Sequence, residues 1–273
     1  MTVPLFDYTR FPYEPVGSGA GGPSSSFVLD LAIDAVGGDV LRAPLEALRV
    51  ALGDDATVWG LKLGPCGYSW ELYFYDYSRI DPRFRVDRVL AVIGDVAPPL
   101  ALSVPVDPRR HFMFSVDVAS TAPRPVHLYF YDVGERMTGL SYGADPSDGW
   151  TLENHYSFYE PATEAALLRE KVVDSPNVSA AVPVERILVP ELVDCRRVCV
   201  ANKPTCDGVY FSGVPLSQFA GFLRSFDYDQ ELVSSVARHE PELDHILYDV
   251  AFDYRSDASG ELEILKSAFY GTV

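Results

Sequence analysis

The alternation of apolar and polar residues along the chain predicts four β-hairpins. Runs with a period of two occur in pairs, and the residues between the members of a pair are rich in Gly, Pro, Asp or Ser. Short alternating runs joined by such turns are typical of antiparallel hairpins. The predicted pairs are 57–63 with 69–77, 111–119 with 126–132, 196–202 with 208–212, and 245–255 with 261–269.

Apolar residues at helical spacing lie between these pairs, so a helix is expected before each hairpin. The first helix follows three serines that can cap it, and the second is stopped by Gly53. Residues 134–160 show no clear period and are expected to form a loop, with at most a short strand at 156–159. The predicted helices cover 27–36, 43–52, 84–93, 161–173, 215–226 and 230–239.

A short internal repeat links the first two hairpins. The sequence Glu-Leu-Tyr-Phe-Tyr-Asp at 71–76 returns as His-Leu-Tyr-Phe-Tyr-Asp at 127–132. In each copy one strand face is purely apolar, and the other combines tyrosines with an ionisable group. The mixed faces carry Glu71, Tyr73 and Tyr75 in the first copy, and His127, Tyr129 and Tyr131 in the second.

The two strand faces favour a barrel. The apolar face suits packing against helices, whereas the tyrosine face suits the interior of a closed sheet that holds a ligand. The predicted fold class is therefore α+β, an antiparallel β-barrel of repeated helix-plus-hairpin units with helices outside. Residues 26–273 would form this single domain, after a flexible arm rich in Pro, Gly and Ser at 1–25. The alternative is an open sheet whose tyrosine face is half exposed or buried in a dimer.

Composition narrows the classes of partner. The formal net charge of −17 argues against binding a nucleic-acid backbone or an anionic membrane surface, because both need a basic face. No stretch approaches the roughly 20 apolar residues of a membrane span, and no secretory signal is evident, so a cytoplasmic location is expected. Neither the four Cys nor the five His show the spacing of a metal site.

Helix-plus-hairpin repeats with tyrosine-rich inward strands resemble the aromatic prenyltransferases of the PT-barrel (ABBA) type. The resemblance is one of pattern and covers residues 27–273. It implies a lumen that holds an isoprenoid diphosphate beside an aromatic or other small acceptor. It also implies that no cofactor is required, with magnesium as an optional companion of the diphosphate. The oligomeric state is left open.

The resemblance also implies roles for particular residues. Glu71 would orient the acceptor. Strand cations would bind the diphosphate, and tyrosines would shield the allylic cation. The implied binding residues are Lys62, Arg197, Arg255, Lys266, Tyr73, Tyr75, His127, Tyr129, Tyr131 and Tyr270. The sequence departs from the pattern at Asp117, Asp249 and Asp253, which bring negative charge into or near the lumen.

Three functions remain open at this stage. A transferase requires Lys62, Arg197 and Lys266 to converge on one anion site. A non-catalytic binding or accessory protein would hold an apolar or aromatic ligand in a tyrosine-lined cavity without converged cations. A structural protein would bury its tyrosine faces in an oligomer, with a filled barrel or no barrel at all.

Overall fold

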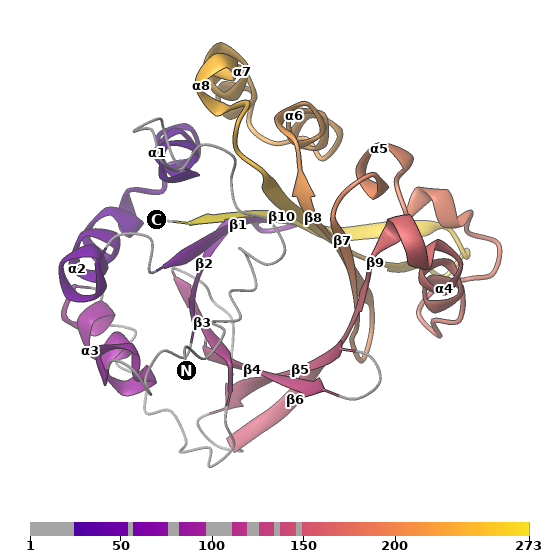
Figure 1. The fold of residues 1–273 in the computed structure, drawn as a ribbon, viewed down its shortest axis with the longest axis horizontal. Helices are drawn as coiled ribbons and strands as arrows, with labels where there is room; N and C mark the ends of the chain where they lie inside the picture. Colours follow the sequence, from indigo (N-terminus) through magenta and orange to yellow (C-terminus); the bar gives the residue numbers. More distant parts are fainter. Residues whose placement is uncertain are drawn as a thin grey trace.

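A computed structural model describes residues 25–53, 57–75, 82–96, 111–118, 126–133, 137–145 and 149–272 of the chain. Within these ranges, ten antiparallel strands close into one barrel (Figure 1). Each strand pairs with its neighbours in sequence, and β1 pairs with β10 to close the ring. The strands are β1 (Val58–Gly64), β2 (Gly67–Tyr75), β3 (Met113–Val118), β4 (Val126–Val133), β5 (Met137–Asp145), β6 (Gly149–Tyr159), β7 (Arg197–Asn202), β8 (Asp207–Val214), β9 (Tyr248–Ser256) and β10 (Leu262–Thr272).

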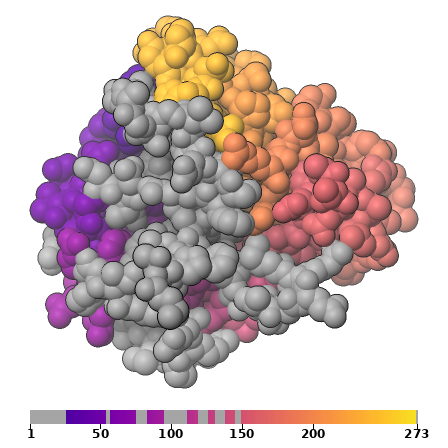
Figure 2. Space-filling model, in the orientation of Figure 1, coloured from indigo at the N-terminus to yellow at the C-terminus, as the bar shows by residue number. Residues whose placement is uncertain are grey.

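Helices lie on the outside of the barrel, so the predicted fold class is confirmed (Figure 1). In the space-filling view they form a rim that runs from indigo α1 and α2 to orange and yellow α6–α8 (Figure 2). The helices are α1 (Ser25–Val36), α2 (Arg42–Leu52), α3 (Val86–Val96), α4 (Pro161–Val173), α5 (Pro190–Val193), α6 (Leu216–Ser225), α7 (Gln230–Arg238) and α8 (Glu240–Leu243), with short 3-10 turns η1 (Asp39–Leu41), η2 (Pro82–Phe84) and η4 (Val184–Arg186).

The main hydrophobic core lies between the barrel and these helices. The outward residues of β1 and β2, such as Trp59 and Phe74, are almost fully buried, as is Phe219 of α6. The Phe219 ring stacks on Tyr248 of β9 with centroids 4.1 Å apart. Burying one such side chain contributes roughly 1.5–3 kcal/mol, so this outer layer stabilises the ring of strands.

The prediction of a loop over residues 134–160 is wrong, except for the short strand expected at 156–159, which lies within β6. Residues of this segment form β5 and β6, a fifth hairpin that begins four residues after β4 ends. Glycine and polar residues weaken the strand signal there. The small residues have a packing role, however, because β5 places Gly139 and Ser141 opposite Tyr156 and Tyr129 in the lumen. A Cβ on Gly139 would lie 3.4 Å from Cβ of Tyr156.

Register shifts interrupt three strand pairs of the described barrel. They lie at Glu153 in the β5–β6 pair, at Leu265 in the β9–β10 pair, and at Gly213 in the β8–β9 pair. An extra residue in a ladder bends the strand and changes which face the next side chain meets. Each shift involves a charged residue of the interior. Glu153 is itself the extra residue, Lys266 follows Leu265, and Asp249 accepts a hydrogen bond from the Gly213 N–H.

The predicted flexible arm at residues 1–25 lies outside the described residues except for Ser25, where α1 begins. The domain boundary at residue 26 therefore stays a prediction. Among the described residues, no helix has both the length and the apolar composition needed to cross a bilayer.

Candidate functional site

The barrel interior contains two cavities that share three tyrosines. A cavity of about 420 Å³, here the polar cavity, lies toward the β7–β8 turn and is lined by charged side chains from β1–β4, β6, β9 and β10. A narrower cavity of about 60 Å³, here the aromatic cavity, lies toward the other end of the strands. Tyr73, Tyr210 and Tyr270 line both cavities and form the tyrosine waist between them.

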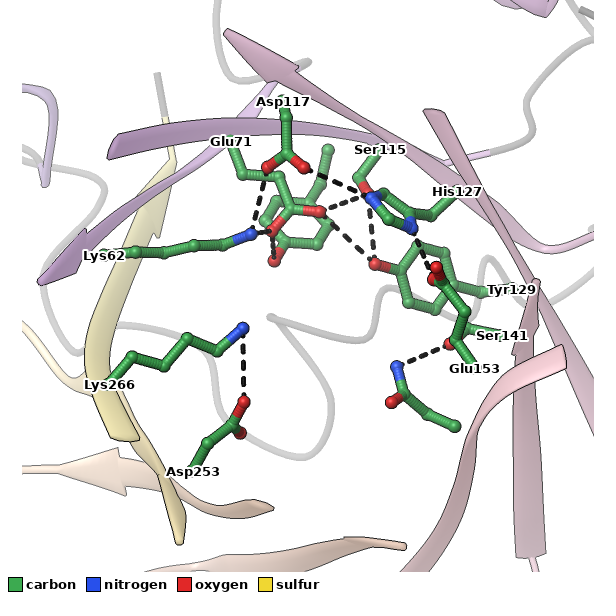
Figure 3. Close-up of polar contacts among 12 residues, drawn as sticks. Lys62, Glu71, Ser115, Asp117, His127, Tyr129, Ser141, Glu153, Asp253 and Lys266 are labelled. Carbon is green, nitrogen blue, oxygen red and sulfur yellow. Dashed lines mark hydrogen bonds and ion pairs between the residues drawn. The ribbon is translucent and has the colours of Figure 1, made fainter. Parts of the chain in front are cut away.

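Lys62 of β1 sits between two carboxylates of the polar cavity (Figure 3). Its ammonium contacts Glu71 of β2 directly and lies 3.0 Å from Oδ1 of Asp117 on β3. The strand register explains the grouping, because Glu71 and Asp117 are directly paired across the sheet. Burial works to lower the pKa of Lys62, but the two carboxylates outweigh it and raise the pKa, so Lys62 stays charged.

Glu71 is the most heavily bonded group of the site. It is only 3% exposed, and besides Lys62 it accepts hydrogen bonds from the Ser115 hydroxyl and, at 2.5 Å, from Tyr73. Burial alone would raise its pKa, whereas Lys62 and then His127 lower it, to about 2. The Tyr129 hydroxyl adds a long fourth hydrogen bond, 3.5 Å from Oε1 of Glu71. Glu71 is therefore ionised at neutral pH, and each of its roughly four lone-pair positions faces a donor.

His127 of β4 is held by carboxylates on both ring nitrogens. Its Nδ1 lies 2.7 Å from Oε2 of Glu153 and its Nε2 lies 3.3 Å from Oδ2 of Asp117. Burial works to lower the pKa of His127, but these two hydrogen bonds raise it to about 9. The ring is accordingly a cation at neutral pH, with both nitrogens acting as donors.

A second charged cluster lies across the polar cavity from the first. Lys203 of the β7–β8 turn donates to Oδ2 of Asp253 at 2.6 Å, and Lys266 of β10 lies 3.2 Å from the same oxygen. The repulsion of Lys203 lowers the pKa of Lys266, and the two ammonium groups outweigh burial to lower the pKa of Asp253. Two cations thus share one carboxylate, which leaves this cluster with a net positive charge.

Lysine is concentrated in the polar cavity. The chain has only four lysines, and three of them, Lys62, Lys203 and Lys266, line this one cavity. In a protein with a net charge of −17, that placement gathers cations where an anionic ligand would need them. The same cavity also carries the carboxylates that pair with them, Glu71, Asp117, Glu153 and Asp253.

The aromatic cavity is built mainly from uncharged rings. Its walls include Tyr129, Tyr156, Phe158 and Met113, and the Tyr129 and Tyr156 ring centroids lie 6.3 Å apart. Burial raises the pKa of both phenols, so they remain neutral and present π-faces rather than charges. Asp249 also lines this cavity, and its Oδ1 accepts the Gly213 N–H at 3.0 Å.

Most of the predicted inward residues do line the lumen. The polar cavity contains Lys62, Lys266, Glu71, Tyr73, His127 and Tyr270, and the aromatic cavity adds Tyr129. The side chains of Tyr75 and Tyr131 lie outside the described part of the structure.

Two of the predicted cations do not join Lys62 and Lys266. Arg197 is paired in register with Ser212, at the opposite end of the lumen, and lies 4.0 Å from Glu160. Arg255 is half exposed, bonds Glu263 at 2.8 Å and lines neither cavity. Lys203 and Lys266 instead meet at Asp253, and Lys62 lines the same cavity across from them.

Sequence reasoning missed Lys203, Glu153 and Tyr210 as interior residues. Lys203 was assigned to a turn, and Glu153 and its bulge fell in the segment expected to be a loop. One sequence signal was available for Lys203. Lysine is rare in this chain, and Lys203 directly follows a predicted barrel strand, so it could have been counted among the candidate binding residues.

Glu71, Asp117 and His127 offer ligand atoms within 4.8 Å of one another, as a metal site would require. Their present bonds, however, do not fit magnesium. Lys62 contacts both carboxylates, and His127 donates to Asp117. The carboxylates of Glu71 and Asp117 are therefore already neutralised by cationic side chains. Magnesium prefers an octahedron of oxygens and keeps several waters, which this lysine-filled cluster does not provide.

The fold and the interior together define a ten-stranded antiparallel barrel with a tyrosine-lined lumen. No protein-family model and no curated protein matches the chain. Among solved structures, the crystal structure of 5-dimethylallyltryptophan synthase from Streptomyces coelicolor is similar, with 11% sequence identity, 89% of each chain covered and a TM-score of 0.45. What this barrel binds must therefore be inferred from its own residues.

Proposed function

We propose that the barrel transfers a prenyl group from an isoprenoid diphosphate to an aromatic or other small acceptor. One observation carries the proposal: the tyrosine waist of Tyr73, Tyr210 and Tyr270 separates a cavity lined by three lysines from a cavity lined by aromatic rings. A molecule with an anionic head and an unsaturated apolar tail fits this arrangement, with its head in the polar cavity and its tail directed toward the aromatic cavity.

In this proposal the diphosphate lies against Lys203 and Lys266, the cluster with a net positive charge. Each ammonium carries three donors and spends one on Asp253, so further donors can reach phosphate oxygens. The positive charge stabilises the pyrophosphate as it leaves. The lysines supply this charge without a metal, and magnesium is a variable for the assay rather than a required cofactor.

The prenyl chain would then pass the tyrosine waist. Tyr73 and Tyr270 rings lie 5.7 Å apart and Tyr210 stacks on Tyr270 at 6.3 Å, which gives a partly enclosing set of π-faces. Burial raises the pKa of these phenols, so they surround the allylic cation as neutral rings. Neutral rings stabilise a carbocation through their quadrupoles without trapping it as an ionised phenolate would.

Glu71 is the proposed acceptor-orienting group. It is ionised and lies beside Tyr73 of the waist. Its longest hydrogen bond, at 3.5 Å from the Tyr129 hydroxyl, is the one that an N–H or O–H of the acceptor would replace. In the transfer, the carbon–oxygen bond of the diphosphate breaks and its electron pair leaves with pyrophosphate. The acceptor supplies the electron pair of the new bond, and its lost proton passes to pyrophosphate, which is a stronger base than Glu71.

A second candidate is a binding or accessory protein that holds an apolar or aromatic ligand without converting it. The ion pairs favour it, because every lysine of the polar cavity already contacts a carboxylate. On this alternative the charged clusters are structural, and only the aromatic cavity is used.

A thermal-unfolding titration with dimethylallyl and geranyl diphosphate, with and without magnesium, separates the two. Transfer predicts saturable stabilisation, about 2.7 kcal/mol at a hundredfold excess over the dissociation constant, that is lost in Lys203→Ala and Lys266→Ala. The fourth lysine, Lys171, lies outside both cavities, so Lys171→Ala is the matched control that keeps the stabilisation. An acceptor panel of phenols, naphthols and indoles, read by mass spectrometry, then tests transfer itself.

No stabilisation by either diphosphate, in a protein that unfolds cooperatively, would contradict the transferase proposal. Stabilisation by the free prenyl alcohol alone would contradict it too, and would support the binding protein. Inorganic pyrophosphate serves as the control for the anionic head.

A further inference from the structure

We infer that Asp253 is an internal competitor for the anion, a carboxylate that weakens and thereby tunes anion binding at Lys203 and Lys266. The inference rests on the proposed function for the identity of the anion, a diphosphate or the pyrophosphate that leaves. It concerns how tightly that anion is held rather than whether prenyl transfer occurs.

The geometry points to competition. One oxygen of Asp253 accepts from Lys203 at 2.6 Å and lies 3.2 Å from Lys266, so it occupies the position between the two ammonium groups (Figure 3 shows the Lys266 contact). A phosphate oxygen that bridged the same two donors would need that position. The carboxylate is 6% exposed and faces the polar cavity, so an incoming anion would meet it in a poorly screened setting.

The charge count points the same way. Lys203 and Lys266 with Asp253 carry a net charge of +1, whereas the same two lysines without it would carry +2. A pyrophosphate bears several negative charges, so its attraction to the cluster is set against repulsion from Asp253 at short range. An anion can be held by such a site, but less tightly than by two unopposed lysines.

The neighbouring strand leaves space for the carboxylate. Asp253 is paired in register with Gly208 of β8, and a Cβ on Gly208 would lie only 2.6 Å from Oδ1 of Asp253. The missing side chain at Gly208 is thus the space into which the carboxylate fits. A methyl group there would push the carboxylate away from its present position and keep its charge in the protein.

Weak holding has a use in the proposed reaction. Pyrophosphate is a product as well as part of the substrate, and two lysines without an opposing carboxylate would retain it. By competing for the same donors, Asp253 would speed the release of pyrophosphate at the cost of some affinity for the prenyl diphosphate. Asp253 is in this sense a residue that sets the balance between binding and release.

The test is the affinity for inorganic pyrophosphate, measured by calorimetry with excess chelator so that no magnesium complex contributes. Asp253→Asn removes the negative charge, and Gly208→Ala displaces the carboxylate while keeping it. We expect each to bind pyrophosphate at least tenfold more tightly than the unaltered protein. The matched control is Glu263→Gln, which removes one negative charge from the exposed pair with Arg255 and should change the affinity less than twofold.

An affinity in Asp253→Asn that is equal to or weaker than that of the unaltered protein would overturn the inference, as would the absence of binding by both. If Asp253→Asn does not unfold cooperatively, Gly208→Ala decides by the same criterion. Tighter pyrophosphate binding without prenyl transfer to any acceptor would overturn the proposed function and leave this inference standing. Where transfer occurs, Asp253→Asn should lower both KM for the prenyl diphosphate and kcat.

Discussion

The two ends of the lumen use opposite chemistry on the same ten strands. In the polar cavity, eight ionisable side chains pair with one another: Lys62, Lys203, Lys266, His127, Glu71, Asp117, Glu153 and Asp253. In the aromatic cavity, neutral rings pack against one another, and Asp249 is the carboxylate of the lining. The difference arises along single strands: on β2 the inward side changes from Glu71 to Tyr73 within one period of the strand. One end should therefore respond to charge and pH, and the other to shape.

The largest effect is expected where a charge would be left buried with fewer partners. Glu71→Ala removes the main counter-ion of Lys62, which is 15% exposed, and breaking such a pair costs about 3–5 kcal/mol of unfolding free energy. Urea unfolding measures the loss. The matched control is Glu263→Gln, whose exposed pair contributes about 0–1 kcal/mol. A loss below about 1 kcal/mol in Glu71→Ala would mean that the ion pair of Glu71 with Lys62 does not stabilise the fold.

The pH dependence of stability should also come from the polar end. The pKa of His127 is raised to about 9, so its contribution is complete below about pH 6.5 and is lost as the pH rises through 9. The pKa of Glu71 is lowered to about 2, so its contribution is complete above about pH 4.5 and is lost as the pH falls toward 2. Each is worth up to roughly 3 kcal/mol.

The alkaline limb is the sharper of the two measurements, because other carboxylates titrate on the acid side. The free energy of unfolding between pH 6 and 9 should fall in the unaltered protein and become flatter in His127→Gln. Tyr156→Phe, in the aromatic cavity, should leave the slope of the unaltered protein. Equal slopes in His127→Gln and the unaltered protein would mean that the imidazole carries no extra proton in the folded state.

The smallest effect is expected from a single phenol of the aromatic cavity. Tyr156→Phe removes one hydroxyl, which accepts from Asn154 at 2.8 Å. Asn154 keeps its second bond to Ser141 at 2.7 Å, so the loss should be near 1 kcal/mol, measured by urea unfolding. A loss as large as that of Glu71→Ala would erase the contrast between the two ends.

Sequence alone predicted the barrel because the information is local. Alternation fixed four hairpins, and the purely apolar faces carrying Leu72 and Phe74 required a helix layer on one side. The tyrosine faces then placed Glu71 and His127 in the lumen, in equivalent positions of two consecutive hairpins.

The rest of the site depended on features without a periodic signal. The bulge at Glu153 breaks the alternation on β6. The resemblance did place Lys266 in the lumen, but the bulge at Leu265, which lets Ile264 be exposed while Lys266 faces the cavity, gave no periodic signal. A strict period of two would place Ile264 and Lys266 on one face. Lys203 lies in a turn, and the pairing of β8 with β9 and of β9 with β10 brings it to the same Asp253 oxygen as Lys266.

The pairing of β1 with β10 has a consequence for how the barrel forms. Val58 is matched with Thr272, so the contact that closes the ring joins the strands most distant in sequence. Such a contact carries the highest loop-closure entropy of the ladder and forms slowly. During synthesis, nine strands would therefore wait as an open, curved sheet with two unpaired edges until β10 leaves the ribosome, and this is the interval in which the protein is most exposed to aggregation.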